Sequence, residues 1–454
     1  MPASPGPRRS TSGWCRISEG PEPPAAPDAP PDDGPPDDVR RAIEAVWRIE
    51  SARVTARLAR LVGDVGAAED LAQDTFVAAL ARWSRWGVPD NPGAWLHTTA
   101  RYLAIDLLRR RDALGGKYAA LGPAPDAVEV DFDAGLDDVG DDLLGLMFMA
   151  CHPVLSPEAR VALTLRLLGG LTTGEIARGF LVPEATVAQR ITRAKRTLAV
   201  AGVRFELPSP AERADRLASV LEVVYLVFNE GYAATAGDAL VRGELAQEAM
   251  RLGRVLTTLV PDEPEAHGLV ALMELHASRL AARTGPEGEA VVLDAQDRTR
   301  WDQLLIRHGL GALARAEALG GAQGPYALQA AIAACHARAR VASDTDWGRI
   351  AALYDALSQV APSPVVEVNR AVALSRAFGP EAGLALADEL VDVPALRSYY
   401  PLPSVRGDLL ERLGRFAEAR DEFVRAAALT GNERERAVLL GRAAACADKV
   451  AAGS

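Results

Sequence analysis

Cysteine is scarce in this 454-residue sequence, which has four of these residues and no CxxC pair: Cys15, Cys151, Cys335 and Cys446. Spacings this wide predict neither a disulfide framework nor a zinc site. They fit the reducing cytoplasm, and we expect the protein to be cytoplasmic. Long apolar runs are also missing, because none approaches the ~18 residues of a membrane span, so we expect no membrane helix. The first stretch lacks the apolar region of a secretory signal.

Motifs for catalysis and cofactor binding are absent from the sequence as well. It contains no GxxxxGK[ST] loop, no HExxH helix and no GxSxG elbow, so nucleotide hydrolysis, zinc proteolysis and serine hydrolysis have no support. The six histidines are scattered and form no ligand cluster. We therefore expect no metal, no cofactor and no enzymatic activity of the chain itself.

Positive charge is in deficit overall, since the formal net charge is -11, and this argues at first against a nucleic-acid partner. The distribution of charge reverses that inference. Residues 39–111 carry 12 basic and 8 acidic side chains, and residues 143–204 carry 8 basic and 3 acidic ones. Residues 112–142 have a net charge of -8, as do residues 205–454. Two basic modules that suit a phosphate backbone are thus joined by an acidic linker and followed by an acidic module.

Apolar residues recur at three- and four-residue spacing along almost the whole chain, and this period predicts an all-α fold. We expect five parts, which are a disordered tail (1–38), a first helical module (39–111), a flexible acidic linker (112–142), a second helical module (143–204) and a helical extension (205–454). In the first module, helices are expected over residues 39–62, 67–86 and 92–111. Pro89 and Pro92 punctuate the chain before the last of these helices.

The second module contains a helix-turn-helix pattern over residues 171–191. Thr172 and Glu175 have the spacing of a capping box, and Pro183 suits the first position of a second helix after a tight turn. Four apolar residues are expected to face inward: Ile176, Ala177, Val187 and Ile191. The outward face of the second helix would carry seven residues: Glu184, Thr186, Gln189, Arg190, Arg193, Lys195 and Arg196. An ordinary helical hairpin with a solvated basic face is the alternative.

Degenerate repeats about 34 residues apart, the tetratricopeptide period, run through the C-terminal extension. The clearest copy has small residues and aromatics at offsets that allow close helix contact: Gly407, Gly414, Phe416, Ala419, Phe423 and Ala426. An earlier copy has a similar pattern: Trp347, Ile350, Tyr354, Leu357 and Pro362. Residues 365–390 are expected to be helical but out of register. Stacked helix pairs usually bind a peptide or protein, and a purely structural role is the alternative.

Together these features resemble the bacterial extracytoplasmic-function (ECF) sigma factors, specifically the group with a tetratricopeptide-like C-terminal extension. Residues 68–76 (AEDLAQDTF) look like the segment that docks on the clamp helices of core RNA polymerase. Residues 95–110 look like the helix that engages the start-proximal (-10) promoter element. Residues 225–232 (YLVFNEGY) and 297–302 (DRTRWD) are similar to runs in this group. The resemblance implies a subunit that binds core RNA polymerase and promoter DNA.

The resemblance also implies roles for individual residues. Core-polymerase binding would fall to a polar and apolar helix face: Asp70, Gln73, Asp74 and Phe76. Contact with the -10 element would fall to Asn91, His97, Arg101, Arg109 and Arg110. The outward face of the helix-turn-helix would read the upstream (-35) element. Trp95 is expected to pack in the core, and Tyr102 departs from the asparagine that is typical of the family.

Two other hypotheses are open on the sequence alone, namely a conventional helix-turn-helix regulator with a helical-repeat sensor and a scaffold with a vestigial DNA module. Residues 69–76 and 91–111 discriminate between them and a sigma factor, because a simple regulator needs neither segment. For the extension, the resemblance implies regulation in place of a separate membrane anti-sigma factor. It also implies small DGPF-type (YCII-related) proteins as regulatory partners.

Overall fold

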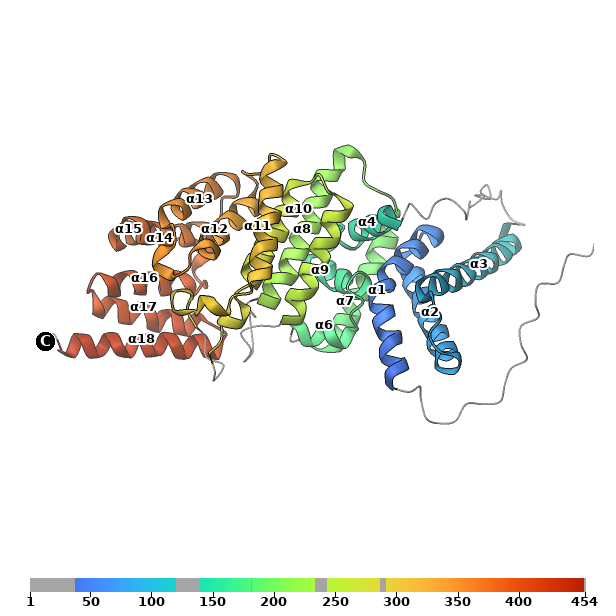
Figure 1. Cartoon of the computed structure of the whole chain (residues 1–454), viewed down its shortest axis with the longest axis horizontal. Helices are drawn as coiled ribbons and strands as arrows, with labels where there is room; N and C mark the ends of the chain where they lie inside the picture. Colours follow the sequence, from blue (N-terminus) through green and yellow to red (C-terminus); the bar gives the residue numbers. More distant parts are fainter. Residues whose placement is uncertain (1–36, 120–138, 181, 233–242, 286–290, 453–454) are drawn as a thin grey trace, which may run out of the picture.

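The structure is a computed structural model that describes residues 37–119, 139–180, 182–232, 243–285 and 291–452. Every regular element in these ranges is a helix, which confirms the all-α prediction for the described part of the chain. The expected disordered tail, except for its last two residues, and most of the expected acidic linker lie outside the described residues. The helices follow one another along an elongated molecule (Figure 1).

Three helices make up the first module: α1 (Asp37–Val62), α2 (Val65–Trp86) and α3 (Pro92–Ala119). Asp64 caps α2, because its Oδ1 accepts a hydrogen bond of 2.6 Å from the amide of Ala67. In the core, the buried Trp83 meets the ring of Trp95 edge-on at a centroid distance of 5.3 Å. The predicted end of α3 at Arg111 was wrong, since the helix continues through two glycines that each cost only about 1 kcal/mol.

The second module has four helices: α4 (Val139–Ala150), α5 (Pro157–Leu167), α6 (Thr173–Phe180) and α7 (Glu184–Val200). Residues 146–151 are all buried, so α4 has no solvent face at its C-terminal end. Ser156 caps α5, where Pro157 occupies the first turn. A helix that is covered on all sides needs partners beyond its own small module, and α1 and the beginning of the extension supply them.

Eleven α-helices form the described part of the extension, with short 3-10 turns between some of them: α8 (Pro210–Tyr232), α9 (Gly243–Leu259), α10 (Pro264–Ala277), α11 (Gln303–Ala318), α12 (Pro325–Arg338), α13 (Trp347–Val360), α14 (Pro364–Phe378), α15 (Pro380–Glu389), α16 (Pro401–Arg412), α17 (Phe416–Leu429) and α18 (Glu433–Ala452). Consecutive helices pack against each other from α10 to α18. A Cβ atom on Gly407 would lie 2.7 Å from the ring of Phe423, so the predicted close contact of the last repeat is confirmed. The stretch 365–390 is two helices, separated at Gly379 with a φ of 105°.

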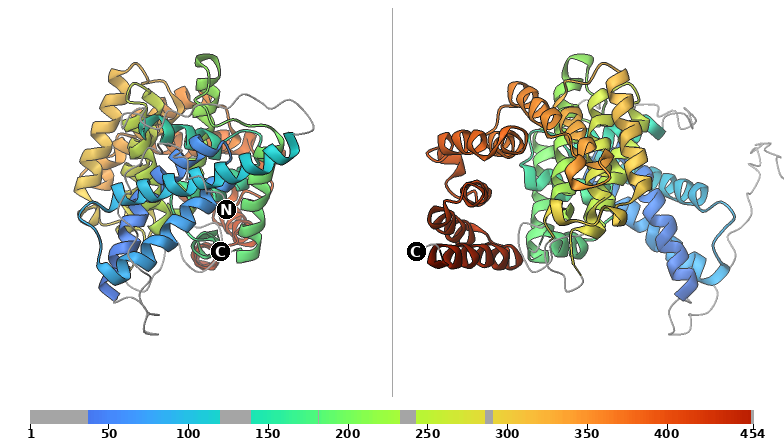
Figure 2. Two further views of the ribbon diagram at one scale, coloured as in Figure 1. Left: turned by 90° about the vertical axis from the view of Figure 1, so that its right-hand side faces the viewer. Right: turned by 60° about the vertical axis from the view of Figure 1, so that its left-hand side comes forward.

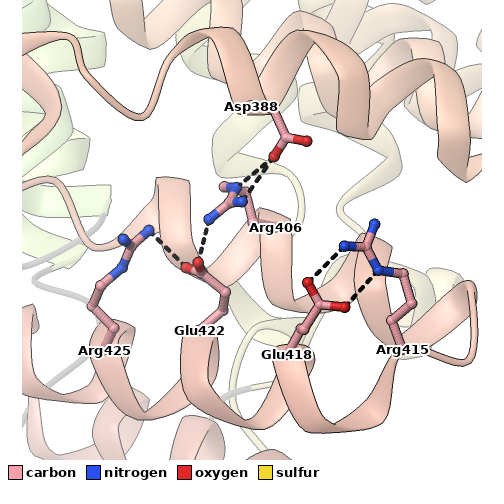
Figure 3. Close-up of polar contacts among 6 residues, drawn as sticks. All are labelled: Asp388, Arg406, Arg415, Glu418, Glu422 and Arg425. Carbon is pink, nitrogen blue, oxygen red and sulfur yellow. Dashed lines mark hydrogen bonds and ion pairs between the residues drawn. The ribbon is translucent and has the colours of Figure 1, made fainter.

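An arginine links three helices of the last repeats (Figure 3). The guanidinium of Arg406 on α16 lies 2.8 Å from Asp388, next to the end of α15, and also pairs with Glu422 on α17. Glu422 in turn pairs with Arg425 at 2.6 Å. Because the Arg406 side chain is only 18% exposed, this network fixes the packing of neighbouring pairs more firmly than a solvated ion pair would.

One apolar cluster contains residues from all three modules. Ala52 and Ala56 of α1 pack in the same apolar cluster as Phe148 of α4 and Phe228 of α8. The first and second modules therefore lie in contact, and the second is covered by the beginning of the extension, while α16, α17 and α18 lie at the far end (Figure 2). The sequence did not predict this contact between the two basic modules, in which α1 and α4 bury apolar side chains against each other.

Polar contacts strengthen the junction between the second module and the extension. Arg160 of α5 donates to the Ser219 hydroxyl at 2.6 Å and to Glu222 at 2.9 Å, both on α8. From the other direction, Arg216 of α8 donates to the carbonyl of Phe148 at 2.8 Å, and Arg251 of α9 donates to a carbonyl of the second module at 2.7 Å. The extension thus holds α4 and α5 with directional bonds as well as by burial.

Candidate nucleic-acid interface

The helix-turn-helix is built by reciprocal caps. The amide of Thr172 donates to Glu175 Oε2 at 2.7 Å, and the amide of Glu175 donates to Thr172 Oγ1 at 3.1 Å, which confirms the predicted capping box. Burial raises the pKa of Glu175, but the hydrogen bonds from Thr172 outweigh it and lower the pKa overall. Thr173 donates to Glu184 at 2.8 Å and so ties the start of α6 to the start of α7. Pro183 stands just before α7 rather than inside it.

The predicted inward face of this motif is buried. Four apolar side chains are between 1% and 6% exposed: Ile176, Ala177, Val187 and Ile191. Ala194 and Leu198 continue the same buried stripe along α7. The orientation of α7 is therefore fixed by packing, and its opposite face is left for contacts with other molecules.

On that opposite face, some of the predicted residues are exposed, and others are half-buried or bonded to residues of the protein itself. Gln189, Arg193 and Arg196 are exposed, and neither arginine makes an ion pair with any residue that the structure describes. Glu184 is exposed but bonded to Thr173. Thr186 is half-buried near the turn. Two long basic donors and an amide on one helix face can reach base edges and phosphates in a major groove.

Arg190 lies in a more crowded place than the sequence predicted. Its side chain is half-buried and lines a cavity of about 220 Å³ together with Phe180 and with Leu226 of α8. Glu158 and Glu230 lie at the same cavity. Leu226 and Glu230 of α8 thus line the same cavity as Arg190 of α7.

Lys195 departs furthest from its predicted role. Its Nζ lies 2.5 Å from Glu69 Oε2 of α2, and the Glu69 side chain is only 9% exposed. Arg166 Nε of α5 donates to the other oxygen of Glu69 at 2.6 Å. Burial raises the pKa of Glu69, but Lys195 and Arg166 together hold it below its usual range. Lys195 is held by Glu69 in this structure, so its contact with DNA stays a prediction and would require this ion pair to open.

The segment predicted to dock on the polymerase presents two exposed carboxylates. Asp70 and Asp74 are exposed on α2. Gln73 is exposed too, but its Nε2 donates to Glu69 Oε1 at 2.9 Å. Phe76 packs against the Trp47 ring at a centroid distance of 4.8 Å, so most of its contribution is to the core of the first module.

The residues predicted to contact the -10 element lie along α3 and just before it. Asn91 caps α3, since its Oδ1 accepts from the amide of Ala94 at 3.0 Å. His97 lies 3.7 Å from Glu50 of α1, and burial lowers its pKa although Glu50 opposes the shift. Arg101, Arg109 and Arg110 are exposed, with Arg110 paired to Asp106 at 2.5 Å. α3 thus presents a row of guanidiniums to solvent.

Sequence reasoning missed Glu69 and Arg166 as a pair. Both residues are charged and stand next to apolar positions, but no local sequence pattern indicates that two residues so far apart in the chain form an ion pair.

Signals for other kinds of site are lacking within the described residues. They hold no group of three His, Cys, Asp or Glu side chains that could bind a metal ion. No described helix has the length and apolar character needed to cross a bilayer.

Comparison with known families and proteins agrees with this arrangement. Residues 48–113 match Sigma-70 region 2, residues 145–198 match Sigma-70 region 4, and residues 216–317 match a family of unknown function, DUF6596. The chain is 43% identical over 404 residues to the uncharacterized protein R00370 of Rhizobium meliloti, covering 86% of this chain and 94% of that protein.

Two similar proteins are named as ECF RNA polymerase sigma factors. The ECF RNA polymerase sigma factor SigL of Mycobacterium tuberculosis is 32% identical over 151 residues, which cover 33% of this chain and 82% of SigL. The ECF RNA polymerase sigma factor SigE of Mycolicibacterium smegmatis is 30% identical over 35% of this chain and 58% of its own length. Among solved structures, yeast Tom70 is similar over 91% of this chain and 86% of its own, with a TM-score of 0.30 and 11% identity, too slight a likeness to bear on the fold.

Proposed function

The chain belongs to the ECF RNA polymerase sigma factors and directs transcription initiation, and we propose that it does so through the exposed residues of α2, α3 and α7 while its extension controls their access. The observation that carries the proposal is the presence of a region 2 match and a region 4 match in one chain, on two basic helical modules. Sigma factors are not a family of enzymes, and RNA synthesis belongs to the polymerase.

The proposed contacts follow from exposure and charge. Asp70 and Asp74 would dock on a basic surface of core polymerase, with Gln73 and Phe76 at the edge of that contact. Arg101, Arg109 and Arg110 would contact the phosphates near the -10 element, beside Asn91 and His97. Gln189, Arg190, Arg193 and Arg196 of α7 would read the -35 element, with Glu184 and Thr186 near the same groove.

The regulatory part of the proposal rests on the closed arrangement of the modules. Promoter elements lie apart on DNA, whereas α2 and α7 are joined through Glu69 and Lys195. α8 lies beside Arg190, and the extension holds α4 and α5 through Arg160 and Arg216. We therefore propose that this is a resting state, in which the extension keeps the second module against the first until a partner releases it. A DGPF-type protein is one such partner by family expectation.

Co-elution of the full chain with core RNA polymerase tests the first step. The purified chain, mixed with core enzyme, should elute with it in gel filtration and should then retard promoter fragments that core enzyme alone leaves free. A protein that retards duplex DNA by itself and never joins core polymerase would be a helix-turn-helix regulator instead.

A further inference from the structure

An arginine and tyrosine cluster lies in the extension, away from the residues proposed for promoter and polymerase binding. Tyr232, the last residue of α8, has the guanidinium of Arg283 4.0 Å from its ring centroid and that of Arg279 at 5.6 Å. Arg283 also donates to the carbonyl of Tyr232. The ring of His276 meets Tyr232 edge-on at 5.2 Å. Two cations thus share one aromatic ring at the point where α8 and α10 end.

The histidines of this cluster carry no charge at neutral pH. Arg279 Nη2 lies 2.8 Å from His276 Nδ1, and because a guanidinium only donates, this nitrogen must accept and be unprotonated. Burial, followed by Arg279 and Arg283, lowers the pKa of His276 well below its usual value. Burial likewise lowers the pKa of His336 on α12 to about 4, with Arg279 adding to the shift. The positive charge therefore belongs to the arginines alone.

The described carboxylates near this cluster lie beside its other members, because Glu435 hydrogen-bonds with Tyr400 and Asp294 lies near His336. Neither Arg279 nor Arg283 makes an ion pair with any residue in the described ranges, although other arginines of the extension do, such as Arg254 with Glu274 at 2.7 Å. Burial, with Arg283 contributing, lowers the pKa of Arg279. In a module with a net charge of -8, two adjacent cations that pair with no carboxylate among the described residues are unusual. Such charges are costly unless an anion compensates them.

Neutral hydroxyl groups complete the surroundings. Tyr354 of α13 lies close enough to Arg279 for each to shift the pKa of the other, and burial raises the pKa of Tyr354 to about 12. Burial also raises the pKa of Tyr400, which precedes α16, and its hydrogen bond with Glu435 adds to the shift, while Arg283 opposes it. Both hydroxyls stay protonated at neutral pH. Side chains from five parts of the helical stack, at α8, α10, α12, α13 and the start of α16, thus converge around the two guanidiniums.

We propose that Arg279 and Arg283 bind carboxylate side chains of an acidic peptide segment in a partner protein, a site distinct from the promoter and polymerase contacts. The planar guanidinium fork matches a carboxylate in two parallel hydrogen bonds, and arginine clusters are a common means of recognising acidic motifs. Stacked helix pairs offer the length that an extended peptide needs.

Binding of a labelled hexaglutamate peptide to the full chain, followed by fluorescence anisotropy at physiological ionic strength, tests the site. Arg279→Gln and Arg283→Gln should each weaken binding at least tenfold, which corresponds to about 1.4 kcal/mol. The matched control is Arg307→Gln, which changes an exposed arginine of α11 and should leave the affinity unchanged. A hexaglutamine peptide should not bind. Circular dichroism checks the fold of each variant.

Two results would overturn the proposal. Equal affinity of the wild type and both glutamine variants would mean that the peptide binds elsewhere, on the basic modules. Loss of peptide binding in excess inorganic phosphate, but not in chloride of equal ionic strength, would assign the site to a small anion rather than a peptide.

Arg279→Lys keeps the positive charge and removes the planar guanidinium fork, so it tests the same site if Arg279→Gln fails to fold. Unchanged affinity in a folded Arg279→Lys variant would exclude bidentate binding at Arg279.

Discussion

Lys195 of the DNA-recognition helix α7 forms an ion pair of 2.5 Å with Glu69 of α2, the helix proposed to dock on RNA polymerase. Arg166 of α5 binds the same carboxylate at 2.6 Å. One buried acid thus joins the two modules that a promoter would have to separate. Without Glu69, Lys195 and Arg166 would be left facing each other. The ion pair of Arg60 with Asp142 at 3.0 Å and the packing of α1 on α4 are further links between the two modules.

Glu69→Gln should destabilise the folded chain by about 3 kcal/mol at neutral pH, because it leaves two partly buried cations unpaired. Asp70→Asn, a change of the exposed neighbouring acid, should stay within about 0.5 kcal/mol. The pKa of Glu69 is lowered in the folded state, so its contribution is present above the ordinary glutamate pKa of about 4.3 and disappears as the pH falls through the lower folded value. Urea unfolding at several pH values measures the free energy of unfolding of both variants. If Glu69→Gln and Asp70→Asn differ in this free energy by the same amount at pH 7 and in acid, this account is contradicted.

Gln189→Ala and Arg190→Ala should each cost about 1 to 3 kcal/mol at particular base pairs and relax specificity there, because these side chains lie on the N-terminal half of α7. Arg193→Ala should weaken binding to all sequences alike and reduce its salt dependence. A panel of base-substituted promoters bound to the holoenzyme measures this. A uniform loss for Gln189→Ala and Arg190→Ala would show that they contact only the backbone.

Reversing Asp70 and Asp74 to lysine should abolish co-elution with core RNA polymerase and leave the helical content intact. Both carboxylates are exposed on α2, and an exposed substitution changes stability by only about 0.5 kcal/mol. Gel filtration with core enzyme and circular dichroism separate the two effects. Reversal of Glu244 to lysine on α9 serves as a control for charge alone. A collapse of helicity in the Asp70 and Asp74 variant would assign these residues to folding.

A chain that ends at Arg204 should aggregate rather than act as a free, active sigma factor. Its α4 would lose the cover that Val224 and Phe228 of α8 give to buried residues such as Leu146 and Phe148. An exposed patch of this kind drives association. Light scattering of the truncated and full chains checks the expectation. A monodisperse, helical fragment would show that the second module does not depend on the extension.

Local features of this protein could be predicted from its sequence, and long-range ones could not. Thr172 and Glu175 formed the predicted capping box, and Gly407 meets Phe423 as the repeat pattern required, because both contacts follow from spacing within one or two helices. The roles of Lys195 and Arg190 depend instead on which modules pack together. The spacing of apolar residues predicts which face of a helix is buried, but it does not predict which module covers that face. The two-arginine cluster at Tyr232 was also out of reach, since its members come from separate helices.

Transcription in a purified system tests the central claim most directly. Core RNA polymerase, genomic fragments and either the wild-type chain or Glu69→Gln are combined, with Glu244→Gln on α9 as the matched control, and transcript starts are mapped. The account predicts initiation at defined sites that depends on the added chain, and more of it with Glu69→Gln, because the two modules separate more easily. If core polymerase starts at no defined site with any of these proteins, the assignment as a sigma factor is contradicted. If the wild type and Glu69→Gln support equal amounts of initiation, the closed resting state is contradicted.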